Sequence, residues 1–426
     1  MLLAVPANEA HAASIAVTNC NDGGSGSLRN AVAGAASGDT IDMSTLACRR
    51  IDLTSGAIRI AQHDLSIVGG PPQVMRIDAG GRSSIFRHSG TGTLRIERVD
   101  ISRGVYSSQT APYGGCLYSA GSIELVNSAV RGCRARGFTH AAYEAGGAIF
   151  AKGAVTLIYS QVVDSLVVYG YGGAIDAGGR LTVLHSRICR NRVKGGVGIA
   201  LSDDGLVASH MTFCDNKGGG IWAQNGRIAI ANSTISGNVG SSIVFLTASP
   251  TAGSTAIVDS TISGNTTYGG PILDLQRNSP KSISNSTIAF NQQVNSCAPS
   301  DGTVRVMGPV PVLLDSTIIS NNLCNGAVGY AVTRPEFSNR TELVGANNLV
   351  TGPSPSNLPL PPDTISADPR LAALADNGGP TRTHALLDGS PAINMGNNEA
   401  GLEYDQRGHG FPRVKGTQAD IGAFER

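Results

Sequence analysis

Apolar and polar residues alternate over short stretches along most of the chain, and the same stretches recur. One six-residue phrase carries apolar residues at both ends and Ser in fourth place. Its copies lie at 125–130, 157–162, 183–188, 230–235, 257–262, 283–288 and 313–318, and a copy with one extra residue lies at 207–213. An alternation with a period of two residues is typical of β-strands. The chain is therefore predicted to consist mainly of short strands.

A second phrase alternates with the first. It opens with Gly, mostly as Gly-Gly, and its copies lie at 114–117, 146–149, 172–175, 196–199, 218–221 and 269–272. The Asn residues that follow the first phrase give the period, since Asn191, Asn216, Asn238, Asn265 and Asn291 are 25, 22, 27 and 26 residues apart. Three short strands with their turns fit this period, and stacked copies form a solenoid. We predict an all-β fold, a single right-handed parallel β-helix with its main coils at 81–350.

The alternation also assigns faces to the residues. Ile175, Ile199 and Ile221 are expected to point inward and form an apolar column. The residue before the recurring Ser is expected at a tight turn in the left-handed conformation, which Asn and Asp tolerate. This turn column consists of Asn127, Tyr159, His185, His210, Asn232, Asp259, Asn285 and Asp315. A regular polar surface is expected from an outward column of Thr234, Thr261, Thr287 and Thr317.

The ends of the chain differ from the coils in their pattern of residues. Residues 14–80 are predicted to form an N-terminal cap and the first coils, with a short amphipathic helix within 27–36 covering the open end. The Pro-rich stretch 351–362 is predicted to be a linker, and 363–426 a C-terminal capping segment.

The composition narrows the possible partners. The 426 residues include 55 Gly, only 15% of them are charged, and the net charge is +1. No global field attracts nucleic acid, and no stretch approaches the roughly 18–20 apolar residues of a membrane span. We expect a monomer that binds neither nucleic acid nor a membrane.

Eight cysteines support export. Cys189 and Cys214 occupy equivalent positions one coil apart, where stacked Cα atoms about 5 Å apart allow a disulfide. The other expected bonds are Cys116–Cys133 within one coil, Cys20–Cys48 in the N-terminal cap and Cys297–Cys324 between late coils. Buried free thiols are the alternative. Disulfides are typical of exported proteins.

The N-terminus points the same way. Residues 1–13 contain Ala10-His11-Ala12, a pattern typical of a signal-peptidase site. We interpret them as the remnant of a secretory signal, with an ordinary disordered N-terminus as the alternative.

Two segments resemble a known family. Residues 17–32 are similar to the start of many bacterial exported β-helix proteins. Residues 376–393, with 405–408 and 419–425, are similar to the C-terminal segment of the "choice-of-anchor Q" family. The resemblance implies a bacterial β-helix that is secreted or held at the cell surface, and it implies no single reaction. Members commonly carry a sorting signal after this segment. The sequence stops at Arg426, so we do not expect covalent anchoring.

Candidate chemistry lies on the outward positions beside the inward Ile residues. Tyr118, Phe150, Asp176 and Trp222 are predicted to share one outward column, where aromatic rings stack on sugars and a carboxylate acts as acid or base. The alternative is that loops cover this column and make it core. Asp203 or Asp204 could supply a second carboxylate, as glycoside hydrolysis requires, although solvated turn residues are the simpler interpretation.

A basic patch lies close by in the sequence. Arg187, Arg190, Arg192 and Lys194 could neutralise uronate carboxylates or bind anionic glycans without catalysis, or they could simply be solvated. No metal-binding motif is present. Asp- and Gly-rich turns could bind Ca²⁺, but no EF-hand loop occurs, and we predict no cofactor.

Two functions remain open. We favour an exported, non-enzymatic β-helix that binds glycans or a cell surface, because the Thr column is regular and no catalytic pair is secure. The alternative is a polysaccharide lyase or glycoside hydrolase that uses Asp176 together with the basic patch.

Overall fold

The structure is a computed structural model that describes residues 12–70, 74–110, 112–137, 144–251, 253–295, 297–298, 301–333, 341–355 and 358–426. The predicted signal remnant therefore lies outside the described residues except for its last two positions.

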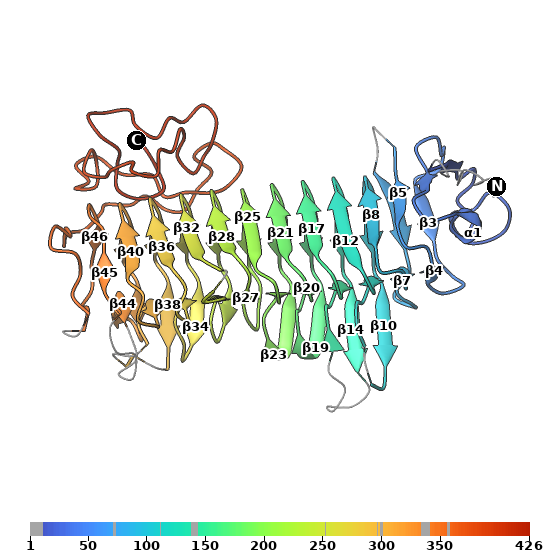
Figure 1. Cartoon of the computed structure of the whole chain (residues 1–426), viewed down its shortest axis with the longest axis horizontal. Helices are drawn as coiled ribbons and strands as arrows, with labels where there is room; N and C mark the ends of the chain where they lie inside the picture. The colour runs from blue at the N-terminus through green and yellow to red at the C-terminus, as the bar shows by residue number, and fades with distance from the viewer. Residues whose placement is uncertain are drawn as a thin grey trace, which may run out of the picture.

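Three long sheets of parallel strands wrap around one core in the described part of the chain (Figure 1). Sheet A contains β1 (Ser14–Ala16), β2 (Thr40–Asp42), β5 (Leu65–Val68), β8 (Thr93–Glu97), β12 (Ser122–Val126), β17 (Val155–Ile158), β21 (Leu181–Leu184), β25 (Leu206–Ser209), β28 (Ile228–Ala231), β32 (Thr255–Val258), β36 (Lys281–Ser284), β40 (Val312–Asp315) and β45 (Leu343–Val344). Sheet B contains β3 (Arg50–Asp52), β6 (Met75–Asp78), β9 (Val99–Ser102), β13 (Ala129–Arg131), β18 (Gln161–Val163), β22 (Arg187–Cys189), β26 (Thr212–Cys214), β29 (Thr234–Ser236), β33 (Thr261–Ser263), β37 (Thr287–Ala289), β41 (Ile318–Ser320) and β46 (Leu349–Val350). Sheet C contains β4 (Ile58–Ile60), β7 (Phe86–His88), β11 (Leu117–Ser119), β16 (Ile149–Ala151), β20 (Ile175–Ala177), β24 (Ala200–Ser202), β27 (Ile221–Asn225), β31 (Val244–Ala248), β35 (Leu273–Leu275), β39 (Val304–Val306) and β44 (Val332–Thr333).

Two short sheets extend many coils between sheets B and C. Sheet D contains β10 (Val105–Ser108), β14 (Arg134–Gly137), β15 (Glu144–Ala145), β19 (Leu166–Tyr171) and β23 (Arg192–Val197). Sheet E contains β30 (Val239–Gly240), β34 (Thr266–Tyr268), β38 (Gln292–Val294), β42 (Leu323–Cys324) and β43 (Ala327–Val328). A coil thus passes through C, A and B and then through D or E. The prediction of an all-β parallel β-helix is confirmed.

The glycines of the second phrase form the corner before sheet C. Gly146 and Gly172 both have φ of 60°, a conformation that glycine adopts without strain. A Cβ atom on Gly146 would lie 2.1 Å from the carbonyl oxygen of Ile149. The phrase recurs because only glycine fits this corner.

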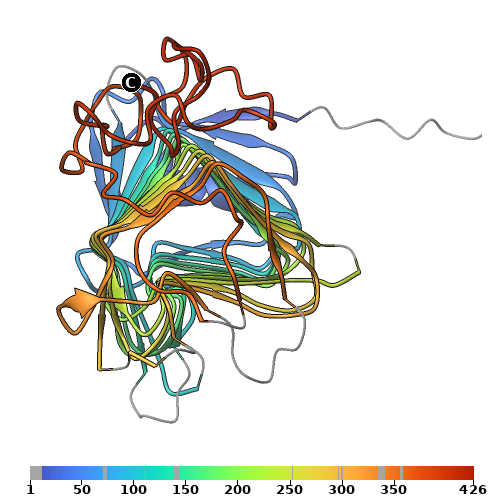
Figure 2. The same cartoon turned by 90° about the vertical axis from the view of Figure 1, so that its left-hand side faces the viewer.

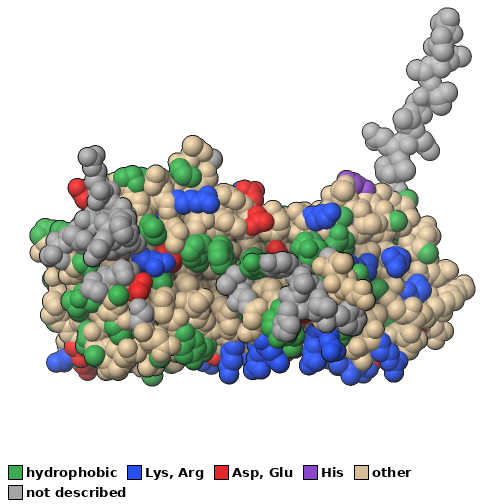
Figure 3. Space-filling model, turned by 90° about the horizontal axis from the view of Figure 1, so that it is seen from below, with side chains coloured by type: hydrophobic (Ala, Val, Ile, Leu, Met, Phe, Trp, Pro, Cys, Tyr) green, Lys and Arg blue, Asp and Glu red, His purple; other side chains and the backbone are tan. Residues whose placement is uncertain are grey.

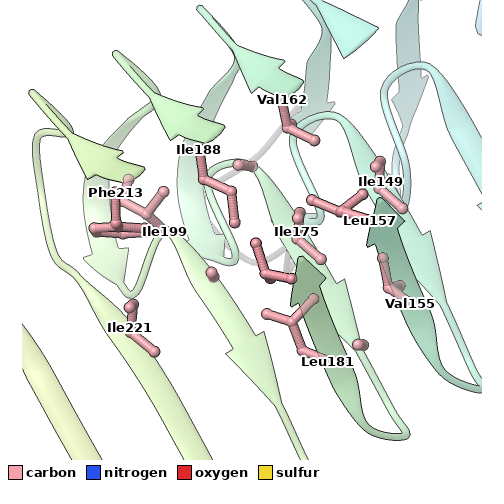
Figure 4. Packing of buried hydrophobic residues seen from close by; sticks show 14 of the residues in the cluster. Ile149, Val155, Leu157, Val162, Ile175, Leu181, Ile188, Ile199, Phe213 and Ile221 are labelled. Carbon is pink, nitrogen blue, oxygen red and sulfur yellow. The ribbon is translucent and has the colours of Figure 1, made fainter. Parts of the chain in front are cut away.

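Stacked aliphatic side chains fill the interior (Figure 4). Ile175 and Ile221 are buried and share one column, as predicted. Ile199 is buried too, but Ala200 takes the position between them in the register. The copy of the second phrase at 196–199 was therefore aligned one residue too early. The error arose because the residue before each sheet C strand, such as Ile199, also points into the core.

The turn column has the expected backbone. Asn127, Tyr159, His185, His210, Asn232, Asp259 and Asn285 all have φ between 44° and 53°. In the last copy Ser316 takes this conformation, not Asp315 as expected. The one-residue shift also places Ile318, instead of Thr317, beside Thr287.

An asparagine ladder runs along the corner after sheet B. Each side-chain amide except the last donates to the Oδ1 atom of the next coil's Asn, at 2.9–3.2 Å. The ladder consists of Asn191, Asn216, Asn238, Asn265, Asn291 and Asn322, all of them buried. The recurring Asn residues are explained by this continuous chain of hydrogen bonds.

Apolar side chains close both ends of the core. Helix α1 (Leu28–Gly34) begins at Ser27, whose side chain accepts a hydrogen bond from Asn30 N, and it buries Leu28 and Val32 over the first coils. At the other end Leu358 is fully buried in the core. The Pro-rich stretch 351–362 thus helps to close the solenoid besides connecting two segments.

The C-terminal segment, residues 363–426, lies along the flank of the last coils (Figures 1 and 2). Thr234, Thr261 and Thr287 of sheet B are buried beneath it. Thr234 Oγ1 donates to the Arg382 carbonyl oxygen at 2.6 Å, and Thr261 Oγ1 donates to Gln406 Oε1 at 2.6 Å. The expectation of a free polar surface on this column was therefore wrong, because the chain itself covers it.

All four expected disulfides are present. The Cα–Cα distances are 6.3, 5.5, 4.6 and 5.7 Å for Cys20–Cys48, Cys116–Cys133, Cys189–Cys214 and Cys297–Cys324. No cysteine of the described residues is free.

Candidate functional site

One column of outward side chains runs along the middle of sheet C. Strand pairing places its members in consecutive coils. They are Arg59, Arg87, Tyr118, Phe150, Asp176, Leu201, Trp222, Phe245, Asp274 and Arg305. The four residues predicted to share a column do share it. We call this set the sheet C column.

Aromatic contacts divide the sheet C column into two clusters. Phe150 stacks on Tyr118 with ring centroids 5.7 Å apart and on Tyr113 with ring centroids 4.6 Å apart. Further along, Trp222 and Phe245 contact each other at 4.5 Å. These rings are partly exposed, so the column is neither a fully open surface nor core. Viewed from the side opposite the C-terminal segment, hydrophobic side chains form a broken band along the molecule, and Lys and Arg gather along one edge (Figure 3).

Asp176 lies between the two aromatic clusters. Its neighbours in the column are Phe150 and Leu201, which cannot hydrogen-bond to its carboxyl group. Burial, with a smaller contribution from the negative charge of Asp203, raises the pKa of Asp176 to about 6. A carboxyl group with this pKa changes its protonation state near neutral pH.

Asp203 lies one coil further on, just after β24. Its backbone amide donates to the Ala177 carbonyl oxygen at 3.1 Å, which places its Cα roughly 8 Å from that of Asp176 by strand spacing and rise. Asp203 Oδ1 accepts a hydrogen bond from Gln224 Nε2 at 3.0 Å. Asp204 follows on the same turn and is exposed. Of the two, Asp203 is the one whose charge acts on Asp176.

The predicted basic patch does not face Asp176. Arg187 lies on the outer face of sheet B, and Arg190 forms an ion pair with Asp164, with Nε and Oδ1 2.8 Å apart. Arg192 and Lys194 are exposed on sheet D, whereas Val193 between them is buried. Because neighbouring residues of a strand face opposite ways, this basic face of sheet D points away from the buried face. The patch is a separate surface.

A small cleft lies beside Trp222 and Phe245. Its volume is about 230 Å³, and glycines of the corner before sheet C form part of its wall. At its end Asp274, 1% exposed, binds Arg305 through two hydrogen bonds of 3.1 and 2.5 Å. Trp222 Nε1 is buried and donates to no acceptor of the described residues. The cleft thus lies along the part of the sheet C column that follows Asp176.

A larger groove of about 940 Å³ separates sheet B from the C-terminal segment. It is lined by Arg187, His185 and His210, among others, and the two imidazole rings stack at 4.4 Å. Both histidines belong to the turn column, as predicted. This groove contains no member of the sheet C column.

Several members of the site escaped the sequence-based prediction. Phe245 and Asp274 follow buried residues of sheet C strands, so the correct register of the second phrase would have identified them. Tyr106 of β10 lies over Arg87, and no repeat marks it, because it comes from the extension in sheet D. No group of three or more His, Cys, Asp or Glu side chains that could hold a metal occurs among the described residues. Within the same part of the chain, no helix is long and apolar enough to cross a membrane.

Comparisons with known proteins give distant similarities. No family model and no curated protein matches the chain. The pectate lyase Pel9A is 13% identical with a TM-score of 0.45, over 97% of this chain and 96% of that one. A mannuronic acid specific polysaccharide family 6 lyase from human gut microbiota is 10% identical with a TM-score of 0.27, over 80% and 86%. Similarities this distant assign no activity to this chain.

Proposed function

We propose that the protein is exported and degrades a polysaccharide. Asp176, on the sheet C column, would act as its catalytic acid or base. The observation that supports this most is the raised pKa of Asp176, about 6, on a partly exposed surface flanked by aromatic rings. A structural aspartate would gain stability from a cation or a hydrogen-bond donor, and Asp176 has neither in the described contacts. Carboxyl groups poised near the working pH are typical of acid–base catalysis.

The aromatic clusters suit an extended glycan. Consecutive side chains of the sheet C column are spaced by one coil, about 4.8 Å, which is similar to the advance of one sugar residue along an extended chain. Rings on both sides of Asp176 offer stacking surfaces for the sugars next to the reacting bond. Asp203 is the candidate for the second carboxyl group of a hydrolase. In a lyase, Asp176 would be the base that removes the proton beside the uronate carboxylate.

Export is supported by the four disulfides, which persist in oxidising compartments. Binding without catalysis, the function favoured from the sequence, loses its main support because Thr234 and Thr261 are covered by the C-terminal segment. Bacterial origin, surface attachment and a monomeric state stay predictions.

The test is turnover of acidic and neutral polysaccharides by the wild-type protein and by Asp176→Asn. We expect at least a 100-fold loss of rate in the variant, with binding retained, because the amide keeps the shape but transfers no proton. The matched control is Asp215→Asn, an exposed turn residue on the sheet B side. Ultraviolet absorbance of an unsaturated product identifies a lyase, and new reducing ends without it identify a hydrolase. Binding without turnover on the whole panel would instead support the non-enzymatic function.

A further inference from the structure

Two arginines stand side by side at the N-terminal end of the sheet C column. Arg59 and Arg87 occupy directly paired positions on β4 and β7. Their Cα atoms are therefore about 4.8 Å apart, the spacing of neighbouring strands. Two like charges at this distance repel each other unless an anion lies near both.

The guanidinium of Arg87 is held between two aromatic rings. Its Cζ atom lies 3.8 Å from the ring centroid of Tyr106 and 4.3 Å from that of Tyr118. Nη1 donates to the Tyr113 carbonyl oxygen at 2.6 Å. Burial and the neighbouring Arg59 lower the pKa of Arg87. The side chain is fixed and partly desolvated, which strengthens its interaction with an anion.

No carboxylate of the described residues forms an ion pair with Arg59 or Arg87. Some arginines on other outward positions are paired, as Arg76 is with Asp100 and Arg95 is with Glu97. In the same column Arg305 is paired with Asp274. Within the described part of the chain Arg187 and Arg192 on other strands have no ion pair either, but Arg87 differs from them because two aromatic rings and a backbone carbonyl oxygen hold its guanidinium in place.

We infer that Arg59 and Arg87 form a binding site for the carboxylate or sulfate group of an acidic polysaccharide lying along the sheet C column. The inference rests on the proposed function and deepens it, since it assigns a charge to the substrate. Arg87 lies three coils from Asp176, about 14 Å. The site therefore binds a sugar residue that lies several sugar residues away from the reacting bond. At the opposite end of the sheet C column Arg305 is paired with Asp274, so no free positive charge is left there.

The experiment measures binding of polygalacturonate, dextran sulfate and uncharged dextran by affinity electrophoresis. All variants are made in the Asp176→Asn background so that cleavage does not interfere. We expect Arg59→Gln with Arg87→Gln to weaken binding of the acidic polymers by about tenfold or more and to leave dextran unaffected. Preference for polygalacturonate or for dextran sulfate tells which anionic group the site binds. Arg49→Gln, an exposed arginine on an early coil beside sheet B, is the matched control.

Equal binding of the acidic polymers by the double variant and by its background would overturn the inference, and so would a lack of binding in both. Arg59→Gln alone keeps the test valid if loss of Arg87 unfolds the protein, because Arg59 is exposed. This result is independent of the turnover assay. A protein that cleaves but binds equally well without the arginine pair refutes only the site, and one that binds through the pair but never cleaves refutes only the catalytic proposal.

Discussion

Two aspartates on the outer face of sheet C and a third on the turn after β24 show how the surroundings determine what a carboxyl group can do. Asp274 is neutralised by two hydrogen bonds from Arg305, and Asp203 accepts one from Gln224. Asp176 has apolar neighbours and the repulsion of Asp203, so its pKa is raised to about 6. Its carboxyl group is therefore prepared to exchange a proton near neutral pH.

Replacing Asp203 by Asn is expected to move the pH profile of turnover to lower pH. The negative charge of Asp203 raises the pKa of Asp176, so its removal lowers that pKa and shifts the corresponding inflection below about 6. If Asp176 is the base, activity rises through this inflection as pH increases; if it is the acid, activity falls. The measurement is kcat/KM against pH for both proteins. An unchanged inflection contradicts the assignment to Asp176.

Part of the site could be predicted from single residues and part could not. Tyr118, Phe150, Asp176 and Trp222 were correctly assigned to one column, because a repeat places equivalent residues above one another. The contact between Arg87 and Tyr106 was not predictable, since it depends on how sheet D folds back. Physically, register follows from the local repeat, whereas contacts between sheets follow from extensions that differ from coil to coil.

Among the structural elements, the asparagine ladder shows how a polar side chain can stabilise the interior. Asn238 Oδ1 accepts from both the backbone amide and the side-chain amide of Asn216, at 3.0 and 2.9 Å. Its own amide donates to the Phe213 carbonyl oxygen and to Asn265. A buried network of this kind is stable only when every member is satisfied.

Asn238→Ala should therefore destabilise the fold by about 3 kcal/mol, because it leaves several buried polar groups without partners at once. Urea unfolding followed by circular dichroism measures the change. Asn30→Ala, on the exposed face of α1, serves as the control and should cost almost nothing. A similar loss for both variants would show that the ladder contributes no special stability.

The elements themselves were easier to predict than their exact alignment. The repeated phrases identified the strands and turns, but the last copy is shifted by one residue, so that Ser316 takes the left-handed conformation. Asp and Ser are both common at turns, so local preferences do not decide whether Asp315 or Ser316 takes the left-handed conformation. Stacking on the preceding coil decides between them, through the pairing of Ile288 with Ile319.

For the whole molecule, the C-terminal segment changes which surfaces are free. Arg413 is fully buried and lies 3.4 Å from the buried Asp259 of the turn column. A second apolar cluster, with Leu386 and Ile421 packed near Ile318, adds to this contact. The segment is thus bound to the last coils by a buried polar contact and by apolar burial together, and the sheet C column is left on another side.

Arg413→Ala is expected to loosen this segment while the coils stay folded. Arg413 donates to the Asp259 carboxyl group and to the Asp420 carbonyl oxygen, and its removal leaves these buried acceptors without that donor, which costs about 1–3 kcal/mol of docking free energy. Hydrogen exchange should then increase across residues 363–426 and change little in sheets A and C, since each coil is stabilised by its neighbours. Lys415→Ala, an exposed residue nearby, is the control. Equal exchange in the two variants would show that these contacts do not hold the segment.

The order of the disulfides has a consequence for how the chain matures. Eight cysteines can pair in 105 ways, yet here the first is joined to the second, the third to the fourth and so on along the sequence, with sequence separations of 28, 17, 25 and 27. No bond encloses a cysteine of another bond. If the chain is exported as proposed and emerges N-terminus first, it can close each bond, and complete the coils around it, before the next pair of thiols appears. Oxidation can then follow the direction of synthesis, without the reshuffling that interleaved bonds would require.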